Sequence, residues 1–225
     1  MLVRNTNPGQ YRCVIFQAQG ISVSQRPRLR RPTRITVRSA WEQRKLGEVA
    51  TFGGGHTPSM ANPDNYDGGT IPWVTSQDVK VTRLYDTTTH ITERAANELT
   101  VYPVGTLVIV VRSGILRHTL PVAELRKPAA VNQDIKAVCP GAGLDGRWLM
   151  QYLLRQNKSL LLEFGKTGTT VESIDFEKMK EMDLPLPSLS EQHAIGALFS
   201  RLDSLITLHQ REAARNHARR QRPET

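Results

Sequence analysis

The sequence predicts a mixed α+β domain followed by a long helix of coiled-coil type. Short β-branched runs bounded by proline and glycine predict buried strands, and apolar residues at helical spacing predict a helix over 147–164. Near the C-terminus a capping signal precedes apolar residues that alternate three and four apart, which is typical of a coiled-coil seam. With 225 residues, 39% of them hydrophobic, the chain can bury one core of moderate size.

Residues 1–40 show no sustained helical or strand period. Their stretch Gln25–Pro32 combines proline with like charges, which favours an extended, solvated backbone. We expect 1–40 to be a basic, disordered leader, foreign to the domain; a basic arm that lies on DNA is the alternative.

Regular structure is expected from Trp41 onward. Glycine and proline mark the loops between the predicted elements. In chain order these are a short element, a tight glycine-rich loop, a short apolar run, a buried strand and a second strand region with polar residues in its middle: Trp41–Ala50, Phe52–Ser59, Ile71–Val74, Val104–Val111 and 129–138.

Two further signals close the domain. Asp145 is placed to cap a helix from about Arg147 to Phe164, and a glycine-threonine loop, Gly165–Thr170, follows it. Leu184–Pro187 then breaks regular structure. These signals bound a folded domain at residues 41–187.

The C-terminal helix is the clearest element. Ser188 and Glu191 have the capping-box spacing, and the seam continues through Ile195, Leu198, Leu202 and Leu205. The next seam positions are polar, so the apolar stripe stops after two heptads. We expect the helix over 188–210 and a basic tail over 211–225.

The formal charge of +9 lies outside the predicted domain. Residues 1–45 carry ten Lys and Arg against one acid, whereas 46–208 carry fifteen against eighteen. Nucleic-acid recognition by the domain would therefore depend on locally placed groups.

The sequence also bears on the compartment. It has no apolar run of membrane-spanning length and no secretory signal. Cys13 and Cys139 fit no paired motif. We expect free thiols in a cytoplasmic protein.

One pattern would carry catalysis. Asp64, Asp78 and Lys80 have the spacing of a nuclease in which two carboxylates hold Mg²⁺ and a lysine assists the attacking water. The glycine pattern Gly141–Gly146 lacks the βαβ surroundings of a nucleotide fold, and the six histidines form no zinc ligand set. A Mg²⁺-dependent endonuclease stays open as an alternative function.

Eight segments in order from Trp41 resemble one half of the DNA specificity subunit of type I restriction-modification systems. Each is weak alone, and their order over about 170 residues is specific. They are Trp41–Val49, Gly54–Ser59, Gly69–Ser76, His90–Glu93, Gly105–Val108, Asn132–Asp134, Gly165–Thr170 and Leu184–Gln192.

The resemblance implies a target-recognition domain of mixed α and β structure over 41–187 and a spacer helix over 188–210. In this family the domain reads one half of a bipartite double-stranded DNA target through the major groove, and the spacer helix packs antiparallel against a counterpart. Partner subunits perform methylation and cleavage with S-adenosylmethionine, ATP and Mg²⁺, so the chain is expected to be non-catalytic and to bind none of these cofactors.

The resemblance also predicts the partners. We expect docking on modification (methyltransferase) subunits, contact with restriction/translocase subunits, and self-association or a second half-subunit through the spacer seam. Family members normally carry two recognition domains, so we expect a half-subunit or a truncated reading frame. A degenerate remnant without DNA affinity is the remaining alternative.

Candidate DNA contacts lie in the loops, where Thr, Ser, Gln and Arg reach base edges and phosphates and glycine allows a close backbone approach. Bidentate contact with guanine would make Arg112 or Arg117 a base reader. The alternative is that these are ordinary turns, with Asn132 and Gln133 tying loops together. The candidates are Gly55, Thr57, Ser59, Ser76, Gln77, Arg112, Ser113, Arg117, His118, Lys166, Thr167, Thr169 and Thr170.

Overall fold

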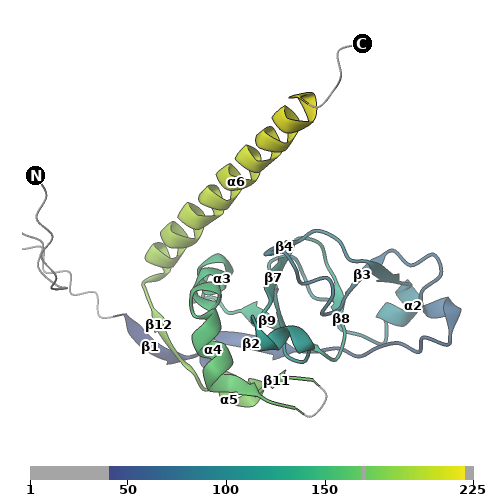
Figure 1. Cartoon of the computed structure of the whole chain (residues 1–225). Coiled ribbons are helices and arrows are strands. Elements are labelled where there is room, and N and C mark those ends of the chain that lie inside the picture. The colour runs from purple at the N-terminus through teal and green to yellow at the C-terminus, as the bar shows by residue number, and fades with distance from the viewer. Residues whose placement is uncertain (1–40, 169–170, 221–225) are drawn as a thin grey trace, which may run out of the picture. The chain divides into compact units, whose positions relative to one another are not determined.

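A computed structural model of the chain describes residues 41–168 and 171–220 (Figure 1). The leader expected over 1–40 and the last five residues of the predicted tail lie outside the described residues, as do Thr169 and Thr170. The predicted domain and the C-terminal helix belong to one unit, Ser39–Thr225.

A five-stranded sheet forms the centre of the domain. Its strand order is β2-β9-β6-β7-β4, with β4 parallel to β7 and the other neighbours antiparallel. Both faces are covered, because alternate residues of β6 belong to two different apolar clusters. The strands are β2 (Ala50–Gly53), β4 (Arg83–Leu84), β6 (Leu107–Val110), β7 (Val122–Leu125) and β9 (Ile135–Pro140).

The buried strand expected over Val104–Val111 is confirmed, since all four residues of β6 are fully buried. The second strand region is two strands, β8 (Ala130–Val131) and β9. Between them the Asn132 side chain accepts a hydrogen bond from the Asp134 amide at 3.0 Å, which makes a tight turn.

A smaller three-stranded sheet extends the domain, with the order β5-β3-β8. It packs on Ala95 and Ala96 of a short helix, which Thr92 caps by accepting a hydrogen bond from the Ala95 amide. Its elements are η1 (Pro63–Asn65), β3 (Ile71–Val74), β5 (Thr89–Ile91) and α2 (Glu93–Ala96).

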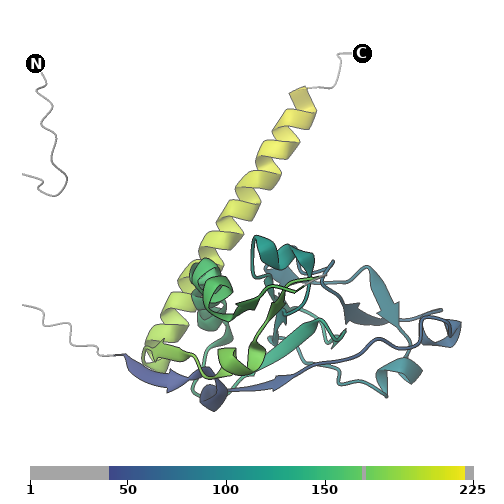
Figure 2. The same cartoon turned by 60° about the horizontal axis from the view of Figure 1, so that its bottom comes forward.

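The small sheet packs on one face of the central sheet. The other face carries the larger apolar core and the remaining elements. There the C-terminal β12 returns to pair with β1, beside the start of the long helix (Figures 1 and 2). These elements are β1 (Glu42–Lys45), α1 (Leu46–Val49), α3 (Gly146–Arg155), α4 (Asn157–Phe164), β10 (Gly165–Lys166), β11 (Ser173–Ile174), α5 (Phe176–Lys180) and β12 (Asp183–Leu186).

The prediction of a single helix over 147–164 is wrong, because the structure has two helices there, α3 and α4, that meet at Gln156. The Asp145 cap is confirmed: its carboxylate accepts a hydrogen bond from the Trp148 amide at 2.9 Å. The break coincides with Asn157, whose side chain accepts from the Leu120 amide at 2.9 Å and donates to the Leu120 carbonyl at 2.7 Å. Those hydrogen bonds fix the start of α4 on the loop before β7.

The long helix α6 spans Leu189–Arg220, 32 residues. The capping box is confirmed, since the Glu191 carboxylate accepts from the Ser188 amide at 2.9 Å and the Ser188 hydroxyl accepts from the Glu191 amide. The helix runs beyond the predicted end at 210, because the alanines and arginines after the seam are strong helix formers. No helix in the described part of the chain is long and apolar enough to cross a membrane.

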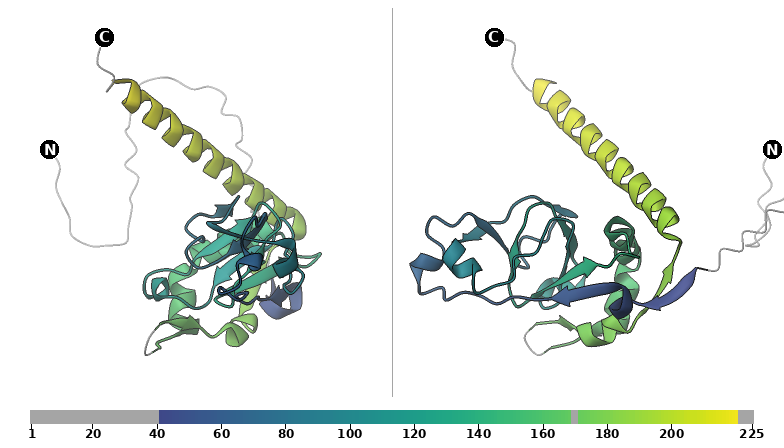
Figure 3. Two further views of the ribbon diagram at one scale, coloured as in Figure 1. Left: turned by 90° about the vertical axis from the view of Figure 1, so that its right-hand side faces the viewer. Right: turned by 180° about the vertical axis from the view of Figure 1, so that it is seen from behind.

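The N-terminal half of α6 packs on α3, and its C-terminal half extends past the domain (Figure 3). Gln192 is fully buried at this contact. Its side chain accepts from the Asp145 amide at 2.9 Å and donates to the carbonyls of Pro187 and Gly143. At Gly196 an added Cβ would lie 2.9 Å from the Arg147 Cβ, so only glycine permits this closeness.

Replacing Gln192 by alanine should lower the free energy of unfolding by about 2–4 kcal/mol, because the buried Asp145 amide and two carbonyls lose their partner. Urea unfolding of the full chain measures the loss. Gln210→Ala, on the exposed part of α6, is the matched control and should change stability by less than about 0.5 kcal/mol. Equal losses in both variants would contradict a structural clip at Gln192.

Candidate nucleic-acid interface

Two parallel strands bring one group of predicted residues to a common edge. β3 and β8 pair with Val74 opposite Val131, so the residues that follow each strand leave the sheet on the same side. Ser76 and Gln77 follow β3, and Gln133 follows β8. This register places Ser76 and Gln77 on the side of the sheet where the Asn132–Asp134 turn lies.

The glycine-rich loop joins this edge through side-chain packing. The Thr57 hydroxyl donates to the Gln133 side-chain oxygen at 2.7 Å. An added Cβ at Gly55 would lie 1.7 Å from the Val131 carbonyl oxygen, so Gly55 is required for packing inside the fold. Ser59 is exposed, and its carbonyl accepts from the Asn65 side chain. These contacts support the framework alternative for Gly55 and Thr57.

The connection after β6 carries the second group. The Val111 amide donates to the Asp134 carbonyl at 2.8 Å, which joins this connection to the same turn. Its next residues are exposed Arg112, then Ser113, which caps the 3₁₀ helix η2 (Gly114–Arg117), then exposed His118.

The β10–β11 hairpin lies beside this connection. The Ser113 amide donates to the Glu172 carbonyl at 3.1 Å, and the Ile174 amide donates to the Val111 carbonyl at 2.8 Å. An open hollow of about 370 Å³ separates the two segments. Arg117, Lys166 and Thr167 line it. Arg112, Ser113, Arg117, His118, Lys166 and Thr167 therefore share one edge of the domain, which we call the arginine edge.

The charges on the arginine edge are partly neutralised. Arg117 forms an ion pair with Glu172, and Lys166 forms one with Asp175 at 2.8 Å. Hydrogen bonds from Arg117 and Lys166 lower the pKa of Glu172 and of Asp175 respectively, so both acids are charged at neutral pH. Arg112 is exposed and has no acidic partner among the described side chains.

The structure gives separate structural roles to the residues of the nuclease pattern. Asp64 pairs with Arg94 at 3.0 Å. Burial alone would raise the pKa of Asp78, but hydrogen bonds from the amides of Thr88 and Thr75 and from the Thr75 hydroxyl hold it below its usual value. Residues 41–168 and 171–220 contain no group of three His, Cys, Asp or Glu side chains that could hold a metal ion.

Lys80, the third residue of that pattern, lines an open groove of about 930 Å³ between residues 80–86 and the polar face of α6. Arg83 crosses the groove and donates to the Ser200 carbonyl at 3.3 Å. On its rim the Arg126 guanidinium lies 5.9 Å from the ring centre of exposed Tyr85. Sequence reasoning missed this groove, because it is formed by segments more than a hundred residues apart.

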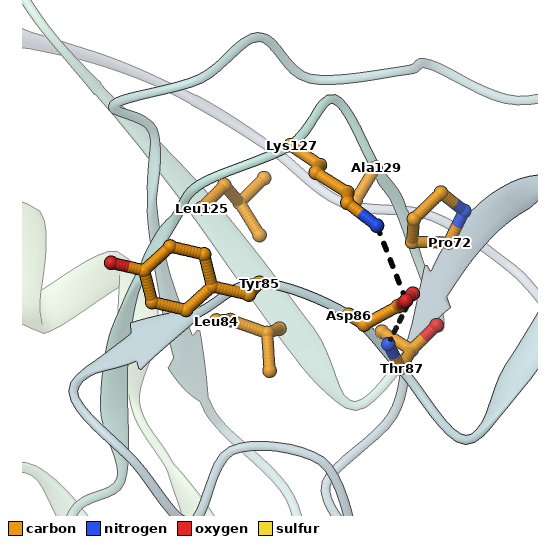
Figure 4. A pocket seen from close by; sticks show the side chains of 8 residues that line it. All are labelled: Pro72, Leu84, Tyr85, Asp86, Thr87, Leu125, Lys127 and Ala129. Carbon is orange, nitrogen blue, oxygen red and sulfur yellow. Dashed lines mark hydrogen bonds and ion pairs between the residues drawn. The ribbon is translucent and has the colours of Figure 1, made fainter.

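Beside Tyr85 a shallow surface depression is filled by its own side chains (Figure 4). Asp86 lies there between the Lys127 ammonium group at 3.2 Å and the His90 ring at 2.7 Å. The hydrogen bond from His90, followed by that from Lys127, lowers the pKa of Asp86 to about 2. The depression therefore holds a cluster of charged and polar side chains, in which Asp86, after β4 of the central sheet, contacts His90 in β5 of the small sheet.

The predicted seam of α6 is largely exposed. Ile195 packs on the main core, whereas Leu198, Leu202 and Leu205 are about half exposed. Phe199 and Ile206 widen the stripe to the a, d and e positions. The heptad pattern predicted the a and d residues but missed the two e residues, which become significant once the helix is seen to leave this face open.

The fold and the exposed stripe define a class of protein: an α+β domain that carries a long helix with an exposed apolar face. The family model described as the type I restriction modification DNA specificity domain matches residues 38–215. The chain belongs to this family.

Curated relatives agree with this assignment. The specificity subunit of the type I restriction enzyme EcoR124I/EcoR124II from Escherichia coli is 33% identical over 73% of this chain and 41% of its own length. The MjaIX specificity subunit from Methanocaldococcus jannaschii is 29% identical over 74% of this chain and 38% of its own. The chain thus spans about two fifths of the curated relatives it matches.

Solved structures show the same fold. One, from work on complex assembly and conformational transition of the type I R-M system, has a TM-score of 0.61 at 22% identity and covers 80% of this chain and 43% of its own. The HsdS subunit from Thermoanaerobacter tengcongensis has a TM-score of 0.53 at 19% identity, over 77% of this chain and 40% of its own.

Asp86 should stabilise the fold at neutral pH and cease to do so in acid. Its folded pKa of about 2 lies below the ordinary value of 3.8, so its contribution is present above pH 4 and is lost as the pH falls toward 2. Urea unfolding of wild type and Asp86→Asn from pH 6 to pH 2 should show a stability difference that shrinks over that window. Asp67→Asn, at an exposed turn, is the control; a constant Asp86→Asn difference would contradict the assignment.

Proposed function

We propose that this chain is a sequence-specific DNA-binding specificity subunit of a type I restriction-modification complex. Its domain over 41–187 recognises one half of a bipartite double-stranded target. The family match over residues 38–215 carries this proposal, and the names of the curated relatives support it.

The chain contributes recognition to the complex and performs no catalysis. Methylation and cleavage belong to modification and restriction subunits, which bind S-adenosylmethionine, ATP and Mg²⁺. The contacts of Asp64 and Asp78 argue against the nuclease alternative, since the Asp64 carboxylate pairs with Arg94 and the Asp78 carboxylate accepts hydrogen bonds from Thr75 and Thr88.

The arginine edge is the proposed DNA contact. Arg112 is free to meet a phosphate, and the Arg117 guanidinium has the fork geometry that pairs with a guanine edge. Half-exposed Ser76 and exposed Gln77 follow β3. Exposed Lys166 and Thr167 lie in and directly after β10 of the hairpin. Gly55 and Thr57 tie the glycine-rich loop to Val131 and Gln133.

The exposed stripe of α6 is the proposed docking face for a second spacer helix. In this proposal, another copy of the chain or a different half-subunit pairs with the stripe and recognises the second half of the target. A two-fold homodimer would recognise a palindromic bipartite sequence, because protein symmetry is mirrored in the site.

Methylome mapping in cells that express the chain with its methyltransferase partner tests the function. We expect methylated adenines in a target of two short specific segments separated by a fixed unspecified gap. A continuous target, or no target, would contradict the proposal. DNA cleavage by the pure chain with Mg²⁺, abolished by Asp78→Ala, would favour the nuclease alternative.

Leu202→Glu should weaken self-association of the full chain by at least about tenfold, because it buries a charge in the proposed helix interface. Sedimentation equilibrium measures the dissociation constant. Leu208→Glu is the matched control, since Leu208 is also an exposed leucine, 54% against 43% for Leu202, and lines the groove on another face of α6. Equal effects of the two substitutions, or a monomeric wild type, would count against the seam as a homodimer interface.

A further inference from the structure

Glu172 is an acidic side chain on an edge otherwise rich in cationic groups. Its side chain is 15% exposed, and its backbone carbonyl is fixed by the Ser113 amide at 3.1 Å. A carboxylate beside DNA repels phosphates, so it lowers non-specific affinity. Its presence here calls for a role other than attraction to the backbone.

The contact that Glu172 makes is specific in its atoms. Arg117 donates to the Glu172 carboxylate through Nε. No hydrogen bond or ion pair to a described residue involves the terminal Nη1 and Nη2 groups, and the Arg117 side chain is 59% exposed. The pair therefore restrains the guanidinium plane while both terminal amino groups stay available.

This arrangement separates orientation from recognition. Arginine reads guanine by donating two parallel hydrogen bonds to O6 and N7, and a long side chain that is already held loses less rotamer freedom when it binds. Restraint through Nε prepares the two remaining donors for such a contact. A rigid supporting shell of this kind sharpens a recognition site.

We infer that Glu172 is a positioning residue that holds Arg117 in the orientation required to read one guanine of the half-site. This inference rests on the proposed DNA-recognition function. It names the base type and the residue pair that select it.

The neighbouring Lys166–Asp175 pair is the natural comparison. Lys166 lines the same hollow, and its ammonium group pairs with the Asp175 carboxylate at 2.8 Å. An ammonium group is a point charge without a fork, so fixing it gives no two-bond base recognition. The two ion pairs thus differ in the one property that the inference requires.

Selection of random-sequence duplex DNA by the full chain, followed by sequencing, tests the inference. We expect the wild type to prefer guanine at one position and Arg117→Ala to lose that preference. Glu172→Ala should reduce the same preference by about tenfold or more while preferences elsewhere remain. Glu172→Gln should retain most of it, because the amide oxygen still accepts from Nε.

Two variants control for folding and charge. Glu172→Asp keeps the charge but withdraws the oxygen by one methylene, so it should also lose the guanine preference with an unchanged melting temperature. Asp175→Asn, which keeps the helix cap of α5, should leave every preference unchanged.

The outcomes distinguish the inference from the function on which it rests. A guanine preference that is lost in Arg117→Ala but kept in both Glu172→Ala and Glu172→Asp would overturn the inference alone. So would an equal rise in affinity for all sequences in Glu172→Ala, since the carboxylate would then act only by repulsion. A wild-type chain that selects no sequence would instead refute the proposed function.

Discussion

The close packing of α6 on α3 is the constraint on which the rest of the structure depends. Gln192 satisfies one buried amide and two carbonyls at this contact, and Gly196 allows the two helices to approach without a side chain between them. The contact fixes the direction in which the long helix leaves the domain. It also decides which face of α6 is covered, so that a polar face lies over the groove and the apolar stripe remains open.

Strand pairing positions the proposed interface in a similar way. The turn after β8, the connection after β6 and the β10–β11 hairpin come from distant parts of the sequence, and backbone hydrogen bonds from Val111, Ser113 and Ile174 join them. Because these bonds involve the main chain, the side chains can change without losing the edge. This is how one framework can present different recognition residues, since the strands set positions and the loops supply chemistry.

The sequence predicted which residues belong to much of the candidate site, but it predicted the structural or binding role of fewer of them. Arg112 and Arg117 follow a recognisable buried strand, and the glycine and proline residues around them predicted that they lie in a loop. The sequence around Gly55 is also typical of a loop that approaches a phosphate. In the structure, however, the Val131 carbonyl occupies the space beside Gly55, so this glycine serves packing inside the fold. Glu172 carried no signal, because its partner lies 55 residues earlier in the chain. The break at Gln156 was missed for the same reason: the Leu120 backbone that holds Asn157 is invisible to local periodicity.

The sequence by itself determined the elements whose cause is local. The β-branched run became β6, Asp145 and Ser188 capped their helices, and the heptad stripe lies on one helix, since each depends on neighbours within a few residues. Only the tertiary structure decided which of these surfaces are covered and which are open. The groove beside Lys80, the restrained Arg117 and the exposed stripe of α6 each arise where distant segments meet or fail to meet. Their physical origin is long-range packing, which no local pattern in the chain encodes.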